Sequence, residues 1–283
     1  MKVFVTGTSG QLGHDVMDIL TERGIPCVGV DLPDFDLTDA EGVKRQVLSC
    51  RPDAIIHCAA YTAVDKAEDC PDDAYAVNVS GTRAIAEAAK ELQAKMIYVS
   101  TDYVFDGQGE TPFQVDDRKA PQNQYGKTKL EGENAVTELL SQYFIVRTSW
   151  VFGGKEGKNF VRTMLRLSET RDTLDVVCDQ VGSPTYSYDL AVLLCDMIVT
   201  DRYGVYHGTN ENFCSWYEFA CEIFKQAGKE MKVNPVTTQE YTSAKAKRPL
   251  NSRLSKQSLD EAGFHRLPTW QDALGRYLKL LAE

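Results

Sequence analysis

Short apolar segments alternate with longer amphipathic segments through the first half of the chain. Apolar and β-branched residues predict strands over residues 2–6, 26–31, 53–57, 95–100 and 143–148. Helical periodicity predicts a helix after each of the first four strands. The second of these helices is opened by a capping box of Thr38 and Glu41, and the third covers residues 73–92. This alternation is typical of a parallel sheet with helices on both faces, so we predict a doubly wound α/β domain of the Rossmann type over residues 1–152.

The second half of the chain is less regular. Helices are predicted over 159–168, 187–199, 215–226 and 269–282, with a capping box of Ser215 and Glu218 at the third. Short strands are predicted near 173–178 and 205–207. We predict a smaller, mostly C-terminal α/β lobe over residues 153–283 that binds substrate, with some segments returning to the sheet and a cleft between the two parts.

A glycine-rich loop follows the first predicted strand and opens the first helix, reading Gly7-Thr-Ser-Gly10-Gln11-Leu12-Gly13. Glycines at such a turn let backbone N–H groups approach a pyrophosphate, which sits on the helix N-terminus. A glycine-rich surface turn is the alternative, and the position directly after the first strand argues against it. These five numbered residues are therefore candidates for dinucleotide binding.

The end of the second predicted strand bears on the choice of cofactor. Asp31 can accept hydrogen bonds from the adenosine ribose and would repel a 2′-phosphate. The segment from Asp31 to Asp39 and the glycine loop contain no Lys or Arg. NADH is therefore favoured, with NADPH as the alternative, although Asp31 could instead only begin a turn. Asp36 and Leu37 either line the adenine pocket or cap the next helix.

Tyr125 and Lys129 lie four residues apart, on one face of a predicted helix. A neighbouring ammonium favours the phenolate, so Tyr125 is predicted to act as a general acid near neutral pH. This spacing also occurs on solvated helix faces. The glycine loop about a hundred residues earlier makes the catalytic interpretation the stronger one.

Composition excludes several classes of protein. The formal net charge of −10 argues against nucleic acid as a partner. No apolar stretch approaches the roughly 20 residues that cross a bilayer, and the N-terminal strand leaves no room for a signal peptide, so a cytoplasmic location is expected. The eight cysteines form no CxxC pair, which favours a reduced and mostly buried set over disulfides or zinc.

Further motifs lie along the whole chain, at 59–68, 100–107, 148–153, 182–185 and 248–253. With the glycine loop and the Tyr125/Lys129 pair, they make the chain resemble the dTDP-4-dehydrorhamnose reductases, a branch of the extended short-chain dehydrogenase/reductase family. The resemblance implies a dTDP-4-keto-6-deoxy sugar as substrate. It implies reduction of the 4-keto group of dTDP-4-dehydro-L-rhamnose to dTDP-L-rhamnose with NAD(P)H, in dTDP-rhamnose biosynthesis.

The resemblance also implies roles for individual residues. Thr101, Tyr125 and Lys129 would form the catalytic group, with the Thr101 hydroxyl bonding the substrate C4 oxygen and Lys129 also holding the nicotinamide ribose. The remaining implied positions are Ala59, Ala60 and Tyr61 for the cofactor, Val64, Tyr103 and Trp150 for the deoxysugar, and Asn159 and Arg248 for the diphosphate or nucleotide.

Some relatives form dimers through Mg²⁺ held by glutamates. This chain has Asp15 at the first such position and no Glu directly after Pro184, so no metal site is predicted, and monomer or homodimer stays open. Another nucleotide-sugar epimerase or reductase remains an alternative, although the enzymes that make GDP-fucose have a cysteine where Asp102 stands. A non-catalytic dinucleotide-binding subunit, like that of methionine adenosyltransferase, is a further alternative. The intact Thr/Tyr/Lys set favours an enzyme.

Overall fold

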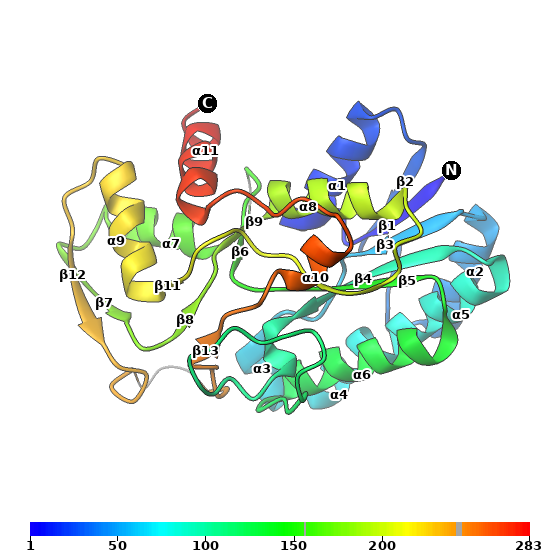
Figure 1. The fold of residues 1–283 in the computed structure, drawn as a ribbon, viewed down its shortest axis with the longest axis horizontal. Helices are drawn as coiled ribbons and strands as arrows, with labels where there is room; N and C mark the ends of the chain where they lie inside the picture. Colours follow the sequence, from blue (N-terminus) through cyan, green and yellow to red (C-terminus); the bar gives the residue numbers. More distant parts are fainter. Residues whose placement is uncertain (156, 242–244) are drawn as a thin grey trace.

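A six-stranded parallel sheet with helices on both faces forms the larger part of the molecule, and a smaller group of helices and short strands lies beside it (Figure 1). The computed structural model describes residues 1–155, 157–241 and 245–283. The sheet strands are β1 (Val3–Thr6), β2 (Cys27–Val30), β3 (Ala54–His57), β4 (Lys95–Thr101), β5 (Tyr143–Thr148) and β10 (Gly204–His207). The five strands predicted in the first half are confirmed to within a residue or two.

The strand order is β10-β5-β4-β3-β1-β2, and all neighbours are parallel. The chain places β2 on one side of β1 and β3 on the other. This reversal of direction creates a crevice at the carboxyl ends of β1 and β3, which is where doubly wound sheets bind their ligands. The short strand predicted near 205–207 joins the large sheet as β10, so this part of the second half returns to the sheet.

Both faces of the sheet are buried. Phe4 and Val5 are neighbours on β1 whose side chains point to opposite faces, and each lies in a different hydrophobic cluster. α1 (Gln11–Glu22) and α8 (Ser187–Ile198) pack together over one face, while α2 (Ala40–Cys50), α5 (Thr82–Leu92) and α6 (Gln124–Leu139) cover the other (Figure 1). Continuous apolar strands are what such a two-sided burial requires.

Two predicted helix starts have different outcomes. The capping box of Ser215 and Glu218 is confirmed at α9 (Trp216–Gln226), where each residue bonds the backbone of the other. The box predicted at Thr38 is wrong. Asp39 caps α2 instead, accepting a hydrogen bond from Gly42 N at 3.0 Å, because the helix begins one residue later and the Asp39 carboxylate reaches its first turn.

The long helix predicted over 73–92 is interrupted. It consists of α4 (Pro71–Tyr75), a π-helical turn (Ala76–Gly81) and α5, and it follows the short helix α3 (Val64–Asp69). Asn78 in the π-helical turn is buried, accepts a hydrogen bond from Tyr61 N at 2.8 Å and donates to Thr128 Oγ1 at 3.0 Å. Such turns are frequent at functional sites, and this one connects the segment after β3 to α6.

The smaller region packs three helices around buried aromatic residues that include Phe152, Phe219 and Tyr277. Its helices are α7 (Phe160–Leu167), α9 and α11 (Trp270–Ala282), and the short α10 (Gln257–Glu261) lies against β10. Its strands form three small sheets: β6 (Val151–Phe152) with β9 (Thr185–Tyr186), β7 (Thr173–Val177) with β12 (Lys232–Val236), and β8 (Val181–Gly182) between β11 (Cys214–Ser215) and β13 (Asn251–Ser252).

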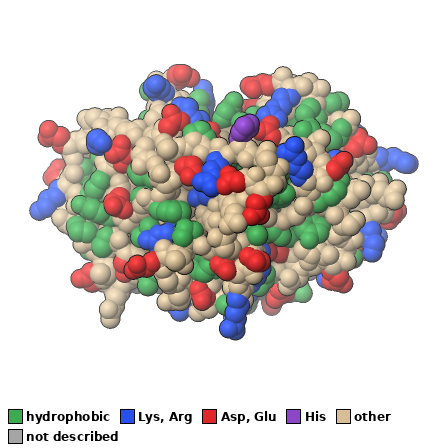
Figure 2. Space-filling model, in the orientation of Figure 1, with side chains coloured by type: hydrophobic (Ala, Val, Ile, Leu, Met, Phe, Trp, Pro, Cys, Tyr) green, Lys and Arg blue, Asp and Glu red, His purple; other side chains and the backbone are tan. Residues whose placement is uncertain are grey.

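Charged side chains of both signs are mixed on the surface of the molecule. On the face in Figure 2, Lys and Arg side chains are separated by acidic and uncharged ones. No helix within the described ranges has the length and apolar character needed to span a bilayer.

All eight cysteines are unpaired, but only Cys195 and Cys214 are fully buried, so the prediction of a mostly buried set was too strong. Among the described residues, no group of three or more His, Cys, Asp or Glu is arranged to hold a metal ion.

Candidate active site

A cavity of about 540 Å³ lies at the carboxyl ends of the first strands, where the sheet topology places a ligand site. Nearly all the residues predicted to bind the cofactor line it, together with Tyr125: Gly7, Gly10, Gln11, Leu12, Gly13, Asp31, Asp36, Leu37, Ala59, Ala60 and Lys129. Tyr61 does not line it. Its backbone N–H is bonded to Asn78, and its buried hydroxyl has no partner among the residues that the structure describes.

The glycine loop has no room for side chains. A Cβ at Gly7, where φ is +75°, would lie 2.7 Å from Ala59 N, and a Cβ at Gly13 would lie 2.1 Å from Gly7 O. No side chain caps α1 at Gly10, so the N–H groups of its first turn are free to meet an anion. The loop therefore fits a dinucleotide pyrophosphate.

Asp31 is bonded within this cavity. Its carboxylate accepts hydrogen bonds from Ser9 N at 2.8 Å and Ser9 Oγ at 2.6 Å. The contact ties the glycine loop to the end of β2, and it leaves an acidic group beside the loop. Among the described residues that line the cavity, Lys129 is the only Lys or Arg.

Tyr125 is held at the start of α6. The helix begins at an Asn123 cap, and burial raises the pKa of the Tyr125 hydroxyl well above its usual value, while a hydrogen bond with Thr101 opposes this shift. The expectation that Lys129 would lower this pKa is therefore wrong, because the desolvation of the phenol dominates. A phenol that keeps its proton at neutral pH is suited to act as a proton donor.

Lys129 contacts strand β4. Its Nζ donates to Val99 O at 2.8 Å and lies 4.0 Å from the centre of the Tyr98 ring. Burial lowers the pKa of Lys129 to about 7, against the opposing influence of Glu133, one helical turn further along α6. Glu133 is itself buried and bonded to Arg147 at 2.7 Å. The side chain thus lies in the cofactor cavity as an amine poised to titrate near neutral pH.

Thr101 ends β4, and its hydroxyl is committed to internal contacts. Its Oγ1 donates to Asp102 Oδ1 at 3.1 Å and accepts from Tyr103 N at 3.2 Å. Asp102 Oδ2 also accepts from Ser252 Oγ at 2.5 Å, and burial raises the pKa of Asp102 to about 6. Thr101 does not line the cavity of the glycine loop. Its side chain also interacts with the Tyr125 hydroxyl, which favours a role in holding Tyr125. From the sequence, Asp102 stood out only as the residue in place of a cysteine.

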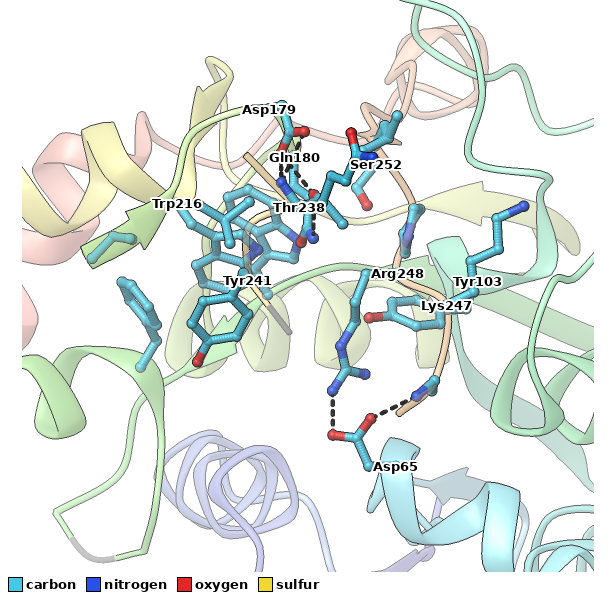
Figure 3. Close-up of a pocket in the computed structure, with 18 of the residues that line it drawn as sticks. Asp65, Tyr103, Asp179, Gln180, Trp216, Thr238, Tyr241, Lys247, Arg248 and Ser252 are labelled. Atoms are coloured by element: carbon cyan, nitrogen blue, oxygen red, sulfur yellow. Dashed lines mark hydrogen bonds and ion pairs between the residues drawn. The ribbon is translucent and has the colours of Figure 1, made fainter. Parts of the chain in front are cut away.

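A second cavity, of about 900 Å³, lies between the sheet and the smaller region (Figure 3). Three residues that the resemblance assigned to the substrate line it, namely Tyr103, Trp150 and Arg248. Trp216, which no sequence pattern indicated, also lines it. The Tyr103 and Tyr125 rings meet edge to face, with centroids 5.5 Å apart, so a wall residue of the second cavity contacts a wall residue of the first.

Trp150 has an unusual backbone conformation, with φ of +51°. Such a conformation is costly for a large residue and is often found at ligand sites. The Trp150 ring stacks on Trp216, with centroids 3.7 Å apart. The two rings form one aromatic wall of the cavity. A tryptophan at the start of a capped helix was visible in the sequence, but nothing there indicated that it would face Trp150.

Two predicted substrate contacts lie outside this cavity. Asn159 caps α7, and its Nδ2 donates to Gln11 Oε1, Gly153 O and Tyr277 Oη at 2.9 to 3.0 Å. These bonds leave Asn159 with a structural role between the glycine loop and the smaller region. Val64 begins α3 and lines neither cavity.

Comparison with known proteins agrees with this geometry. The family model of the RmlD substrate binding domain matches residues 1–283. The chain is 41% identical over 286 residues to the dTDP-4-dehydrorhamnose reductase of Aggregatibacter actinomycetemcomitans, covering 96% of this chain and 97% of the relative. It is 37% identical over 279 residues to the dTDP-4-keto-6-deoxy-D-glucose reductase of Streptomyces niveus, covering 98% and 96%.

A solved structure is also similar to this chain over nearly its full length. The crystal structure of dTDP-4-dehydrorhamnose reductase from Bacillus anthracis in complex with NADP superposes with a TM-score of 0.95, at 43% identity and with 99% of each chain covered. The family model and these relatives cover both the sheet and the smaller region, which places the two cavities within the matched part of the chain. The chain therefore belongs to the dTDP-4-dehydrorhamnose reductase family.

Proposed function

We propose that the chain reduces the 4-keto group of dTDP-4-dehydro-L-rhamnose to give dTDP-L-rhamnose, with Tyr125, Lys129 and Thr101 as its catalytic group. The observation that carries the proposal is the position of Tyr125. It lines the cavity of the glycine loop, and its ring contacts Tyr103 in the second cavity. A proton donor in this position can serve a sugar in one cavity beside a dinucleotide in the other.

Each residue of the catalytic group has its own role in the reaction. A reduced nicotinamide cofactor, when bound, supplies the hydride to C4 of the sugar. Tyr125 donates its phenolic proton to the oxygen at C4 as negative charge develops there, so the carbonyl becomes a hydroxyl. Thr101 orients the phenol, and the ammonium form of Lys129 stabilises the phenolate that is left behind. Thr101 and Lys129 are buried and Tyr125 is partly buried, which strengthens the electrostatic contacts among them.

The direct test is turnover by the purified protein. NADH absorbance should fall when dTDP-4-dehydro-L-rhamnose is added, and the product should be the 4-hydroxy sugar without further inversion. A second candidate substrate is dTDP-4-keto-6-deoxy-D-glucose, because the Streptomyces niveus relative is named for its reduction. A higher kcat/KM for that sugar would replace the proposed substrate. Binding of NADH without oxidation in the presence of either sugar would favour a non-catalytic dinucleotide-binding protein.

NADH is the proposed cofactor, and Asp31→Ala should narrow its advantage over NADPH. The carboxylate repels a 2′-phosphate, and two charges near 4 Å interact by about 1 kcal/mol in water, so we expect the ratio of the two kcat/KM values to fall by roughly 5-fold. Asp34→Ala is the matched control, since Asp34 lies in the same segment but does not line the cavity. A wild-type preference for NADPH would contradict the assignment of NADH as the cofactor. Both cofactors should be titrated, because the structure of the Bacillus anthracis relative is a complex with NADP.

Arg248→Ala should weaken binding of the nucleotide sugar. A guanidinium matches phosphate oxygens, and loss of a charge-assisted hydrogen bond of roughly 1.5 to 3 kcal/mol should raise KM for the sugar by about 10-fold or more. NADH affinity should stay unchanged, because Arg248 does not line the cofactor cavity. Arg253→Ala is the control, since that side chain is bonded to Asn251 and does not line the substrate cavity. An unchanged KM would leave the diphosphate without an assigned partner.

NADH affinity should fall as the pH rises through about 7. Burial holds the pKa of Lys129 at about 7 in the free protein. The ammonium form, present below that pH, binds ribose hydroxyls and the anionic cofactor better than the neutral amine. Binding should therefore take up a proton, and Kd should rise with pH above 7, by at most about tenfold per unit. Fluorescence titrations between pH 6 and 9 measure this slope, and Lys129→Ala should flatten it. An equally steep slope in that variant would assign the titration to another group.

A further inference from the structure

We propose that Asp65 and Asn123 are positioning residues that hold the segment 245–248 beside Tyr125, so that the site for the substrate diphosphate is formed before the substrate arrives. This inference rests on the proposed function, because it takes Arg248 to bind that diphosphate. Neither residue was predicted from the sequence, and each acts through the backbone or side chain of the 245–248 segment.

Asp65 is the centre of the first contact. One oxygen, Oδ1, accepts hydrogen bonds from Lys245 N at 3.1 Å and Ala246 N at 2.9 Å. The other, Oδ2, accepts from Arg248 Nη2 at 2.6 Å (Figure 3). Lys245 Nζ also pairs with Asp69, one turn further along α3. A single carboxylate on α3 therefore fixes three donors of a segment that lies some 180 residues later in the chain.

Asn123 makes the second contact, at the start of the catalytic helix. Its Oδ1 accepts from Gly126 N at 2.8 Å and caps α6, while its Nδ2 donates to Lys247 O at 2.9 Å. The side chain is only 4% exposed. Tyr125 is two residues further on, so one amide connects the proton donor to the residue that precedes Arg248. The residue that caps the catalytic helix therefore also holds the segment that carries Arg248.

The geometry indicates that Asp65 positions Arg248 and does not compete with the substrate for it. The Arg248 guanidinium carries five N–H donors, and the Asp65 contact uses only the Nη2 nitrogen. Arg248 lines the substrate cavity, and its charge there opposes the rise that burial causes in the pKa of Tyr103. The Asp65 side chain is 45% exposed and that of Arg248 23%, so the ion pair alone adds little stability. The two backbone bonds are what anchor the segment.

The two roles predict opposite signs for the same variant. If Asp65 positions the segment, its loss should weaken binding of a nucleotide diphosphate. If it competes for Arg248, its loss should strengthen that binding. Calorimetric titration of dTDP into the full-length protein distinguishes them without requiring turnover. We expect Asp65→Ala to raise the Kd for dTDP by about 10-fold, the scale of two backbone hydrogen bonds, and Asp65→Asn, which keeps an acceptor oxygen, to raise it less.

The kinetic readouts separate positioning from a general loss of structure. In Asp65→Ala, KM for the nucleotide sugar should rise with Kd, while kcat stays within about 3-fold and the Kd for NADH is unchanged. Asn123→Ser should behave in the same way, because serine keeps the helix cap but cannot reach Lys247. In a double-mutant cycle, Asp65→Ala should add little to Arg248→Ala. Full additivity, or a Kd for dTDP that is unchanged or lower in Asp65→Ala, would overturn the proposal.

The dTDP titrations test the role of Asp65, and the turnover assay tests the proposed function, so the two can fail separately. Wild-type protein that binds dTDP but oxidises no NADH with the keto-sugar would contradict the proposed function, and the dTDP titrations would still decide the role of Asp65. Wild-type protein that does not bind dTDP would overturn both.

Discussion

Tyr125→Phe is expected to lower kcat by roughly 10²- to 10⁴-fold, the usual range for the loss of a general acid. The phenol lines the cofactor cavity, and desolvation raises its pKa so that it keeps its proton at neutral pH. Phenylalanine keeps the ring contact with Tyr103 and removes only the hydroxyl. NADH affinity should change little, because the glycine loop and Lys129 remain. Steady-state oxidation of NADH with the keto-sugar measures the effect.

A matched control is Tyr61→Phe. That hydroxyl is also buried, but it lines neither cavity and has no partner within the described part of the chain. We expect its kcat to stay close to the wild-type value. Near wild-type turnover in Tyr125→Phe would remove Tyr125 from the catalytic group.

Lys129→Ala is expected to have the broadest effect, with kcat lowered by about 10²-fold or more and NADH bound more weakly. The amine lies in the cofactor cavity and is buried within the sheet face of α6, so its loss removes both a charge near the phenol and a donor to the cofactor. Stopped-flow single turnovers and NADH titrations separate the two contributions.

The alanine variant also leaves a cavity, which can lower stability by itself. Lys129→Met fills most of the volume without the charge, so it serves as the control for packing. If both variants lower kcat but leave NADH binding intact, Lys129 has only the electrostatic role. If NADH binding alone is weakened, its role is confined to the cofactor.

The strand and helix pattern of the first half was predictable because it depends on local sequence. A strand buried on both faces is mostly apolar, as in β1, where only the last residue, Thr6, is polar. The glycine loop excludes side chains at Gly7, because a Cβ there would lie 2.7 Å from Ala59 N, just after β3. The cofactor cavity follows from these two features and from the position of the loop after the first strand. Most residues named for it from the sequence therefore line it.

Other features depend on residues that are distant in the chain, and no local pattern reveals them. Asp65 meets Arg248, and Trp150 meets Trp216, only after the smaller region has folded against the sheet. Asn159 had the chemistry of a phosphate ligand, yet the tertiary structure gives its amide to Gln11 and Tyr277. Which partner a polar side chain finds is settled by packing.

The ionisation of Tyr125 and Lys129 also depends partly on local sequence and partly on tertiary structure. The sequence by itself determined that Tyr125 and Lys129 share one helical face, because their spacing matches the helical period. Only the tertiary structure decided that burial raises the pKa of Tyr125, lowers that of Lys129 to about 7 and directs the ammonium to Val99. Desolvation depends on how many atoms surround a charge, and those atoms come from strands and helices that the local sequence does not specify.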